Sequence, residues 1–143
     1  MAQDEHETLE LQEQKRASGR VLIVDHDENA LIALKTLLEE ATYDTTKARS
    51  GQKALQLLCH GTFDLVLLDD NLLDEGGEEI VRQVRNVSRS APVIVMQSMP
   101  LSADRSVRYA RLGACFFTDR SDPATIAEHV HHYLSRTQCC CRF

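Results

Sequence analysis

The stretch that decides the fold runs from Phe63 to Asp70 and reads FDLVLLDD. Its apolar run is short and does not alternate with polar residues, a pattern typical of a strand buried on both faces. We therefore predict a strand over Phe63–Leu68, which stops at the adjacent carboxylates Asp69 and Asp70. Strands of this kind occupy the interior of parallel sheets that carry helices on both sides.

Four more strands and five helices are predicted around this stretch. The strands are Arg20–Val24, Tyr43–Ala48, Val93–Met96 and Cys115–Thr118. Apolar residues at helical spacing predict helices after Asp27, Ser50 and Gly77, over Ser102–Leu112, and from Pro123 to about Arg136. Strict alternation of strands and helices implies a parallel sheet with helices on both faces. With right-handed crossovers, we expect a flavodoxin-like, doubly wound α/β domain of (βα)5 type, whose five-stranded sheet has the order 2-1-3-4-5.

Length and composition indicate one folded domain. The chain has 143 residues, of which 43% are hydrophobic, enough to bury a substantial core. We place this domain at residues 20–137. Residues 1–19 form a polar N-terminal extension, for which helix and disorder are both open. Residues 138–143 form a Cys-rich tail.

Charge and hydropathy exclude several classes of protein. A formal net charge of −6 gives no reason to expect binding to nucleic acid or to a membrane surface. No apolar run approaches the roughly 20 residues of a membrane span. The start of the chain is polar and acidic, unlike a secretory signal, so we expect a cytoplasmic protein with reduced thiols. Cys59 and Cys115 lie in apolar surroundings and are expected to be small buried residues.

Two carboxylates from distant segments are predicted to share one crevice. Asp25 follows the first strand and Asp69 follows the third. In a sheet of this order, ligands bind beyond the carboxyl ends of the strands, at the switch point between strands 1 and 3. Clustered carboxylates recruit a hard cation such as Mg²⁺ or take up a proton. The alternative is that Asp25 and Asp69 only cap the segments that follow them.

Several short motifs recur in the order and at the spacing of a known family. They are VLIVD at Val21–Asp25, FDLVLLD at Phe63–Asp69, Gly77, APVIVM at Ala91–Met96, Gly113-Ala114 and Phe117. In this arrangement, from about Arg20 to Leu134, the chain resembles the response regulator receiver domains (CheY-like) of two-component signalling. A flavin-binding electron carrier is disfavoured because the loops lack a cradle for the flavin phosphate.

The resemblance implies a phosphorylation site and a metal site. Asp69 would be the phosphoacceptor, and Asp25, Asp69 and the carbonyl of Asn71 would hold Mg²⁺. Either Asp27 or His26 would complete this site, and the choice between them is open. The resemblance also implies a signalling module rather than an enzyme.

The resemblance further implies partners. The phosphoryl donor would be a sensor histidine kinase or a phosphotransfer protein. Phosphorylation would alter the face formed by the predicted helix 102–112, the strand 115–118 and the last helix, which would bind a target protein or form a homodimer. Only about ten residues follow the last helix, too few for an effector module. We therefore expect a stand-alone regulator that acts by protein–protein contact.

Three active-site positions depart from the pattern of the family. His26 stands where the family has a second acid, so we expect weak or absent Mg²⁺ binding. Gln97 replaces a Ser or Thr that contacts the phosphoryl group. Arg120 replaces a Lys, and because Ser121 replaces the following Pro, we expect a trans peptide bond between them. Phe117 retains the switch aromatic. A phosphorylated receiver and a pseudo-receiver, which binds partners without phosphorylation, are therefore both open.

The helix over 102–112 carries arginines at regular spacing. Arg105, Arg108 and Arg111 recur every three residues, with Tyr109 beside them. One hypothesis is that this face binds an acidic partner, such as the N-terminal segment of another copy. The alternative is a solvated helix face.

Overall fold

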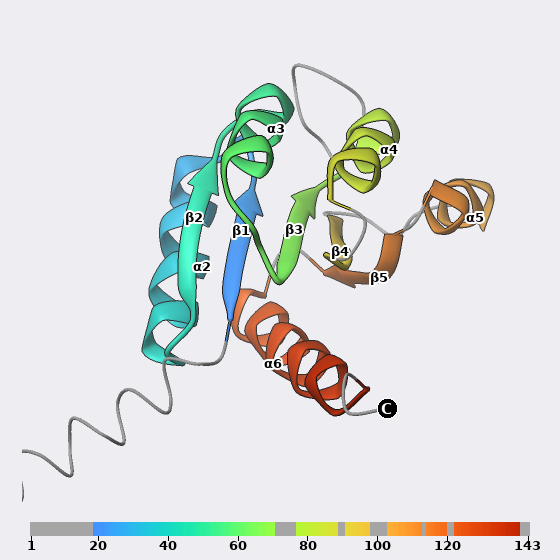
Figure 1. Cartoon of the computed structure of the whole chain (residues 1–143). Coiled ribbons are helices and arrows are strands. Elements are labelled where there is room, and N and C mark those ends of the chain that lie inside the picture. Colours follow the sequence, from blue (N-terminus) through green and yellow to red (C-terminus); the bar gives the residue numbers. More distant parts are fainter. Residues whose placement is uncertain are drawn as a thin grey trace, which may run out of the picture.

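A parallel five-stranded sheet forms the centre of the computed structural model (Figure 1), which describes residues 19–70, 77–88, 91–97, 103–112, 114–119 and 122–140. The strands are β1 (Arg20–Val24), β2 (Asp44–Ala48), β3 (Leu65–Asp69), β4 (Val93–Gln97) and β5 (Ala114–Asp119). The helices are α2 (Glu28–Glu40), α3 (Gly51–His60), α4 (Gly77–Val87), α5 (Ala103–Leu112) and α6 (Pro123–Cys140). The strand order is β2-β1-β3-β4-β5, which confirms the predicted flavodoxin-like topology.

Alternation along the strands divides the core into two clusters. In β3, Leu65 and Leu67 pack with residues of α2 and α6 on one face of the sheet. Val66 and Leu68 pack with residues of α3, α4 and α5 on the other face. All four side chains are fully buried. Because both faces of this strand are covered, every position favours an apolar residue, which explains the unbroken apolar run in the sequence.

Two helices begin at the caps that the sequence predicts. The carboxylate of Asp27 accepts a hydrogen bond from the backbone N–H of Asn29 at 3.0 Å, at the start of α2. The hydroxyl of Ser50 accepts one from the backbone N–H of Lys53 at 3.1 Å, at the start of α3. Each cap satisfies a backbone donor that has no partner within its helix.

Helix α6 begins where predicted but ends later. Asp122 accepts a hydrogen bond from the Thr125 hydroxyl at 2.6 Å, which lowers the pKa of this carboxyl. Pro123 is the first helical residue. The helix continues to Cys140 instead of ending near Arg136, because no Gly or Pro interrupts the sequence there. The expected Cys-rich tail therefore begins inside α6. No helix among the described residues is long and apolar enough to span a membrane.

The expectation that Cys59 is buried was wrong. The buried residues of α3 include Ala54 and Leu58, which are four positions apart and share one face of the helix. Cys59 is the next residue along and turns toward the exposed side, so its thiol is accessible. The side chain of Cys115 lies outside the described part of the chain.

Helix α2 ends in a tight turn that the sequence does not signal with a glycine. Thr42 has φ 75°, in the left-handed region that β-branched residues avoid. Its backbone N–H donates to the Glu39 carbonyl at 2.9 Å, and that of Tyr43 donates to the Leu38 carbonyl at 3.0 Å. This pair of bonds is a Schellman motif, and the apolar contact that usually accompanies it is provided by Leu38 and Tyr43, both buried.

Replacing Thr42 with glycine is expected to raise the free energy of unfolding by about 1 kcal/mol. The gain is the relief of backbone strain, reduced by the greater freedom of glycine in the unfolded chain. Urea denaturation of the two proteins measures it. The matched control is Glu40→Gly in the last turn of α2, where glycine relieves no strain and should destabilise. An unchanged or lower stability for Thr42→Gly would mean that the turn is not strained.

Candidate functional site

The site lies where β1 and β3 end side by side. The Cα register pairs Val24 with Leu68, so the next residues, Asp25 and Asp69, reach the same edge of the sheet. The backbone N–H of Asp25 donates to the carbonyl of Ala48 in β2 at 3.0 Å. Asp25 is 0% exposed and Asp69 is 1% exposed. The fold therefore buries two carboxylates at one edge of the sheet.

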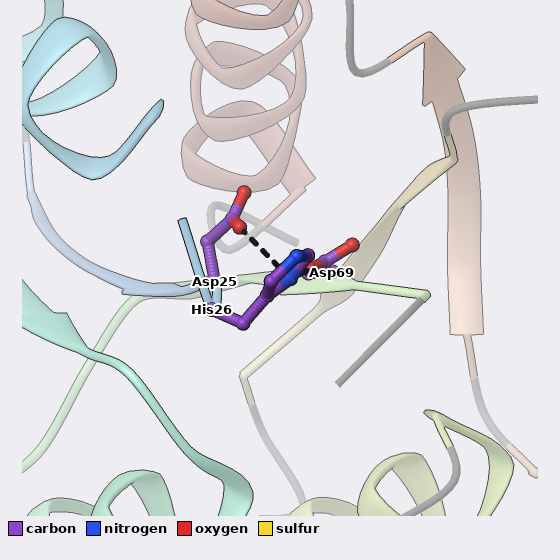
Figure 2. A group of neighbouring side chains, drawn as sticks. All are labelled: Asp25, His26 and Asp69. Atoms are coloured by element: carbon purple, nitrogen blue, oxygen red, sulfur yellow. Dashed lines mark hydrogen bonds and ion pairs between the residues drawn. The ribbon is translucent and has the colours of Figure 1, made fainter. Parts of the chain in front are cut away.

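His26 joins these two carboxylates into one cluster. Its Nδ1 lies 2.5 Å from Asp69 Oδ2 and 3.6 Å from Asp25 Oδ1. Figure 2 shows the imidazole ring between the two acids. A carboxylate can only accept, so Nδ1 carries the hydrogen that is donated to Asp69. The side chain of His26 is 25% exposed, which makes it the solvent-facing member of the cluster.

Asp27 does not take part in this cluster as a ligand. Its carboxylate is the cap of α2, and its backbone N–H donates to Asp25 Oδ1 at 2.9 Å. This contact orients the Asp25 carboxylate. Of the two residues that the sequence left open, His26 is therefore the one beside Asp25 and Asp69.

The structure describes only some of the other predicted site residues. Gln97 is the last residue of β4, directly after Met96, which is the register partner of Asp69. The backbone of Phe117 lies in β5, but its side chain is outside the described residues. Asn71 and Arg120 also lie outside them, as does the peptide bond between Arg120 and Ser121. The roles of these residues remain predictions.

Sequence reasoning missed the contact that Tyr109 makes beside the site. The tyrosine was placed next to the exposed arginines of α5, but its side chain is 0% exposed. Its hydroxyl donates to Oδ1 of Asp70, the residue after Asp69. The spacing to Leu112 could have indicated an inward position for Tyr109, because residues three apart share a helix face. No pattern in the sequence indicates that its partner is Asp70, which comes from a distant segment.

The arginine-bearing face of α5 is partly engaged within the domain. Arg108 Nε lies 3.0 Å from Glu78 Oε1, which ties α5 to α4. Arg108 and Arg111 also line an open hollow together with the acid Asp104 and with Val107, whose side chain is 48% exposed. The side chain of Arg105 is outside the described residues. This face therefore combines cations with an exposed apolar residue.

The donor set of the Asp25–His26–Asp69 cluster does not match the preference of Mg²⁺. This ion takes oxygen ligands in near-ideal octahedral geometry. Here the third donor is an imidazole nitrogen, and it already contacts an oxygen of Asp69. Imidazole suits zinc, copper and nickel ions better than magnesium. The residues present therefore do not fit the ion that the family resemblance implies.

The family model described as the response regulator receiver domain matches residues 21–130. A CheY-like response regulator receiver domain protein from Methanospirillum hungatei is similar in structure, with a TM-score of 0.78 and 25% identity. The match covers 83% of this chain and 95% of that chain.

Two curated relatives are similar over part of their length. The transcriptional regulatory protein GltR of Pseudomonas aeruginosa is 33% identical over 126 residues, which are 85% of this chain and 52% of GltR. The transcriptional regulatory protein ZraR of Klebsiella oxytoca is 31% identical over 94 residues, which are 66% of this chain and 21% of ZraR. The chain therefore spans about half of the length of GltR and about a fifth of that of ZraR.

Proposed function

This chain belongs to the response regulator receiver family, and on that premise we propose that Asp69 accepts a phosphoryl group from a sensor histidine kinase or a phosphotransfer protein. The observation that carries the proposal is the position of Asp69. It ends the central strand β3, within the cluster that also contains Asp25 and His26. Receiver domains are signalling modules, and the proposed output is a change in protein–protein contact.

The proposed step is a phosphoryl transfer between side chains. An oxygen of Asp69 attacks the phosphorus of a phosphohistidine on the donor protein. The new O–P bond forms as the N–P bond breaks, and the donor imidazole leaves and takes up a proton from solvent. Because His26 Nδ1 lies 2.5 Å from Asp69 Oδ2, its N–H would contact an oxygen of the arriving group. The His26 contact must first be released from the attacking oxygen.

The proposed output surface is the face of α5, β5 and α6. Tyr109 supports this choice, because its hydrogen bond to Asp70 links α5 to the residue that follows the phosphoacceptor. Arg111 and the exposed Val107 lie on the same helix. We propose that this face binds a target protein or a second copy of the chain, in the cytoplasm where the kinase domain of a sensor would reach it.

Acetyl phosphate tests the proposal without a kinase. After incubation of the full chain with acetyl phosphate and Mg²⁺, intact mass spectrometry is expected to show the addition of one phosphoryl group. Asp69→Asn should show no addition. The matched control is Asp44→Asn, because Asp44 is an exposed carboxylate on β2, away from the site. An adduct that survives Asp69→Asn would contradict the assignment of Asp69.

A second candidate function is a pseudo-receiver that binds its partner without phosphorylation. The observation that favours it is the contact of His26 with Asp69, which engages the phosphoacceptor oxygen while the side chain is almost fully buried. An unmodified wild-type mass under the same conditions would favour this candidate. The pseudo-receiver function also predicts that Asp69→Asn leaves the thermal stability and the oligomeric state of the domain close to those of the wild type.

A further inference from the structure

We propose that Asp25, His26 and Asp69 bind a borderline transition-metal ion, represented by Zn²⁺, in preference to Mg²⁺. The proposal goes beyond the proposed function, because it concerns the unphosphorylated domain and requires no phosphoryl transfer. It starts from the mismatch between an Asp-His-Asp donor set and magnesium. One imidazole nitrogen with two carboxylate oxygens is a donor set of the kind found in zinc sites.

The three donors converge from two strand ends. One ligand atom of each residue lies within 4.8 Å of the other two. Asp25 and His26 follow β1, and Asp69 ends β3, so the register of the sheet holds the two groups of donors at one edge. The arrangement therefore does not depend on a mobile loop. Figure 2 shows the His26 ring next to the side chains of Asp25 and Asp69.

The spacing of the donors is close to that of a four-coordinate ion. Zn²⁺ with ligands at about 2.1 Å in tetrahedral geometry keeps those ligands about 3.4 Å apart. The distance from His26 Nδ1 to Asp25 Oδ1 is 3.6 Å, near this value. The distance to Asp69 Oδ2 is 2.5 Å, so this pair would have to open by about 0.9 Å. A small rotation of the partly exposed His26 side chain can provide this movement.

Burial and charge also favour an ion at this place. Asp25 and Asp69 are 0% and 1% exposed, and a cation bound between two buried carboxylates stabilises the folded state. A divalent ion balances both charges. His26 would bind it through Nδ1 as neutral imidazole with its hydrogen on Nε2, so Nδ1 gives up the hydrogen that it donates to Asp69 in the absence of the ion. The 25% exposure of His26 leaves one side open for entry of the ion and for a fourth ligand from solvent.

A supporting contact orients one ligand before the ion arrives. The backbone N–H of Asp27 donates to Asp25 Oδ1 at 2.9 Å. Hydrogen bonds of this kind hold metal ligands in position. Since the Asp27 carboxylate caps α2, it does not compete as a third oxygen donor. His26 is thus the residue that determines which ion the site prefers.

Isothermal titration calorimetry with Zn²⁺ and with Mg²⁺ tests this preference. The full chain is used with all five cysteines replaced by serine, because free thiols would also bind zinc. We expect one Zn²⁺ per chain, bound at least about tenfold more tightly than Mg²⁺. His26→Asp is expected to narrow this difference, because it removes the imidazole ligand that favours Zn²⁺ and leaves a site of oxygen donors, which suit Mg²⁺.

Two further variants make the outcome decisive. His26→Ala should weaken Zn²⁺ binding by at least about tenfold, while its circular dichroism melt shows whether the fold is kept. His132→Ala changes an exposed position of α6, and this variant should bind Zn²⁺ as tightly as the cysteine-free parent chain does. Zinc binding that is unchanged by His26→Ala, or tighter binding of Mg²⁺ than of Zn²⁺ to the parent, would overturn the proposal. Phosphorylation is read separately by mass, so either proposal can fail without the other.

Discussion

Replacing Tyr109 with alanine is expected to lower the free energy of unfolding by about 3–5 kcal/mol, the range for truncation of a buried aromatic side chain. The Tyr109 ring is 0% exposed and belongs to the core cluster that also contains Val66 and Val81. Truncation would leave a cavity between α5 and the sheet, and it would remove the donor to Asp70. Urea denaturation gives the change, provided that the slope of the transition is unchanged.

Tyr109→Phe separates the hydrogen bond from the packing. This variant retains the ring and loses only the donor to the Asp70 carboxylate. We expect a loss of about 1.5–3 kcal/mol, the range for a hydrogen bond to a charged group. Hydrogen exchange of the α5 backbone should also become faster, because the bond ties that helix to the end of β3.

Val107 provides the matched control for both Tyr109 variants. It lies on the same helix, but its side chain is 48% exposed, so Val107→Ala should change stability by no more than about 0.5 kcal/mol. If Tyr109→Phe were as stable as the wild type, the hydroxyl of Tyr109 would have no structural role beside Asp69. If Tyr109→Ala were also stable, α5 would not be packed on the sheet as described.

The substitution His26→Asp is expected to accelerate phosphorylation of Asp69 by acetyl phosphate about ten- to hundredfold at saturating Mg²⁺. In the wild type, the His26 N–H contacts Oδ2 of Asp69, the proposed phosphoacceptor, at 2.5 Å. A hydrogen bond to a charged group is worth about 1.5–3 kcal/mol, and removing that stabilisation of the ground state lowers the barrier by a similar amount. The new carboxylate also provides an oxygen ligand for the hard cation.

The rate of adduct formation, followed by intact mass, measures this effect. The matched control is His60→Asp, which introduces the same residue at an exposed position at the end of α3 and should leave the rate unchanged. The acceleration should depend on Mg²⁺, because without the ion a third carboxylate repels the incoming phosphate. A slower His26→Asp variant at saturating Mg²⁺ would show that His26 assists the transfer instead of restraining Asp69.

Much of the fold could be predicted because it depends on local patterns. The apolar run of β3 and the helical spacing after Asp27 and Ser50 each specify an element within a few residues of chain. The end of α6 was misjudged because no residue near Arg136 stops a helix, and the exposure of Cys59 was misjudged because its apolar neighbours face the other side of α3. These errors concern where an element ends and which way a side chain turns.

The sequence by itself determined the order of the sheet and the meeting of Asp25 with Asp69. Right-handed crossover connections leave few ways to arrange strands and helices that alternate along the chain. Only the tertiary structure decided which groups these acids contact. His26 meets Asp69 across 43 positions of the chain, and Tyr109 meets Asp70 across 39. Periodicity identifies which face of an element is buried, but a hydrogen bond depends on the positions of two particular atoms, and only the packed core sets those.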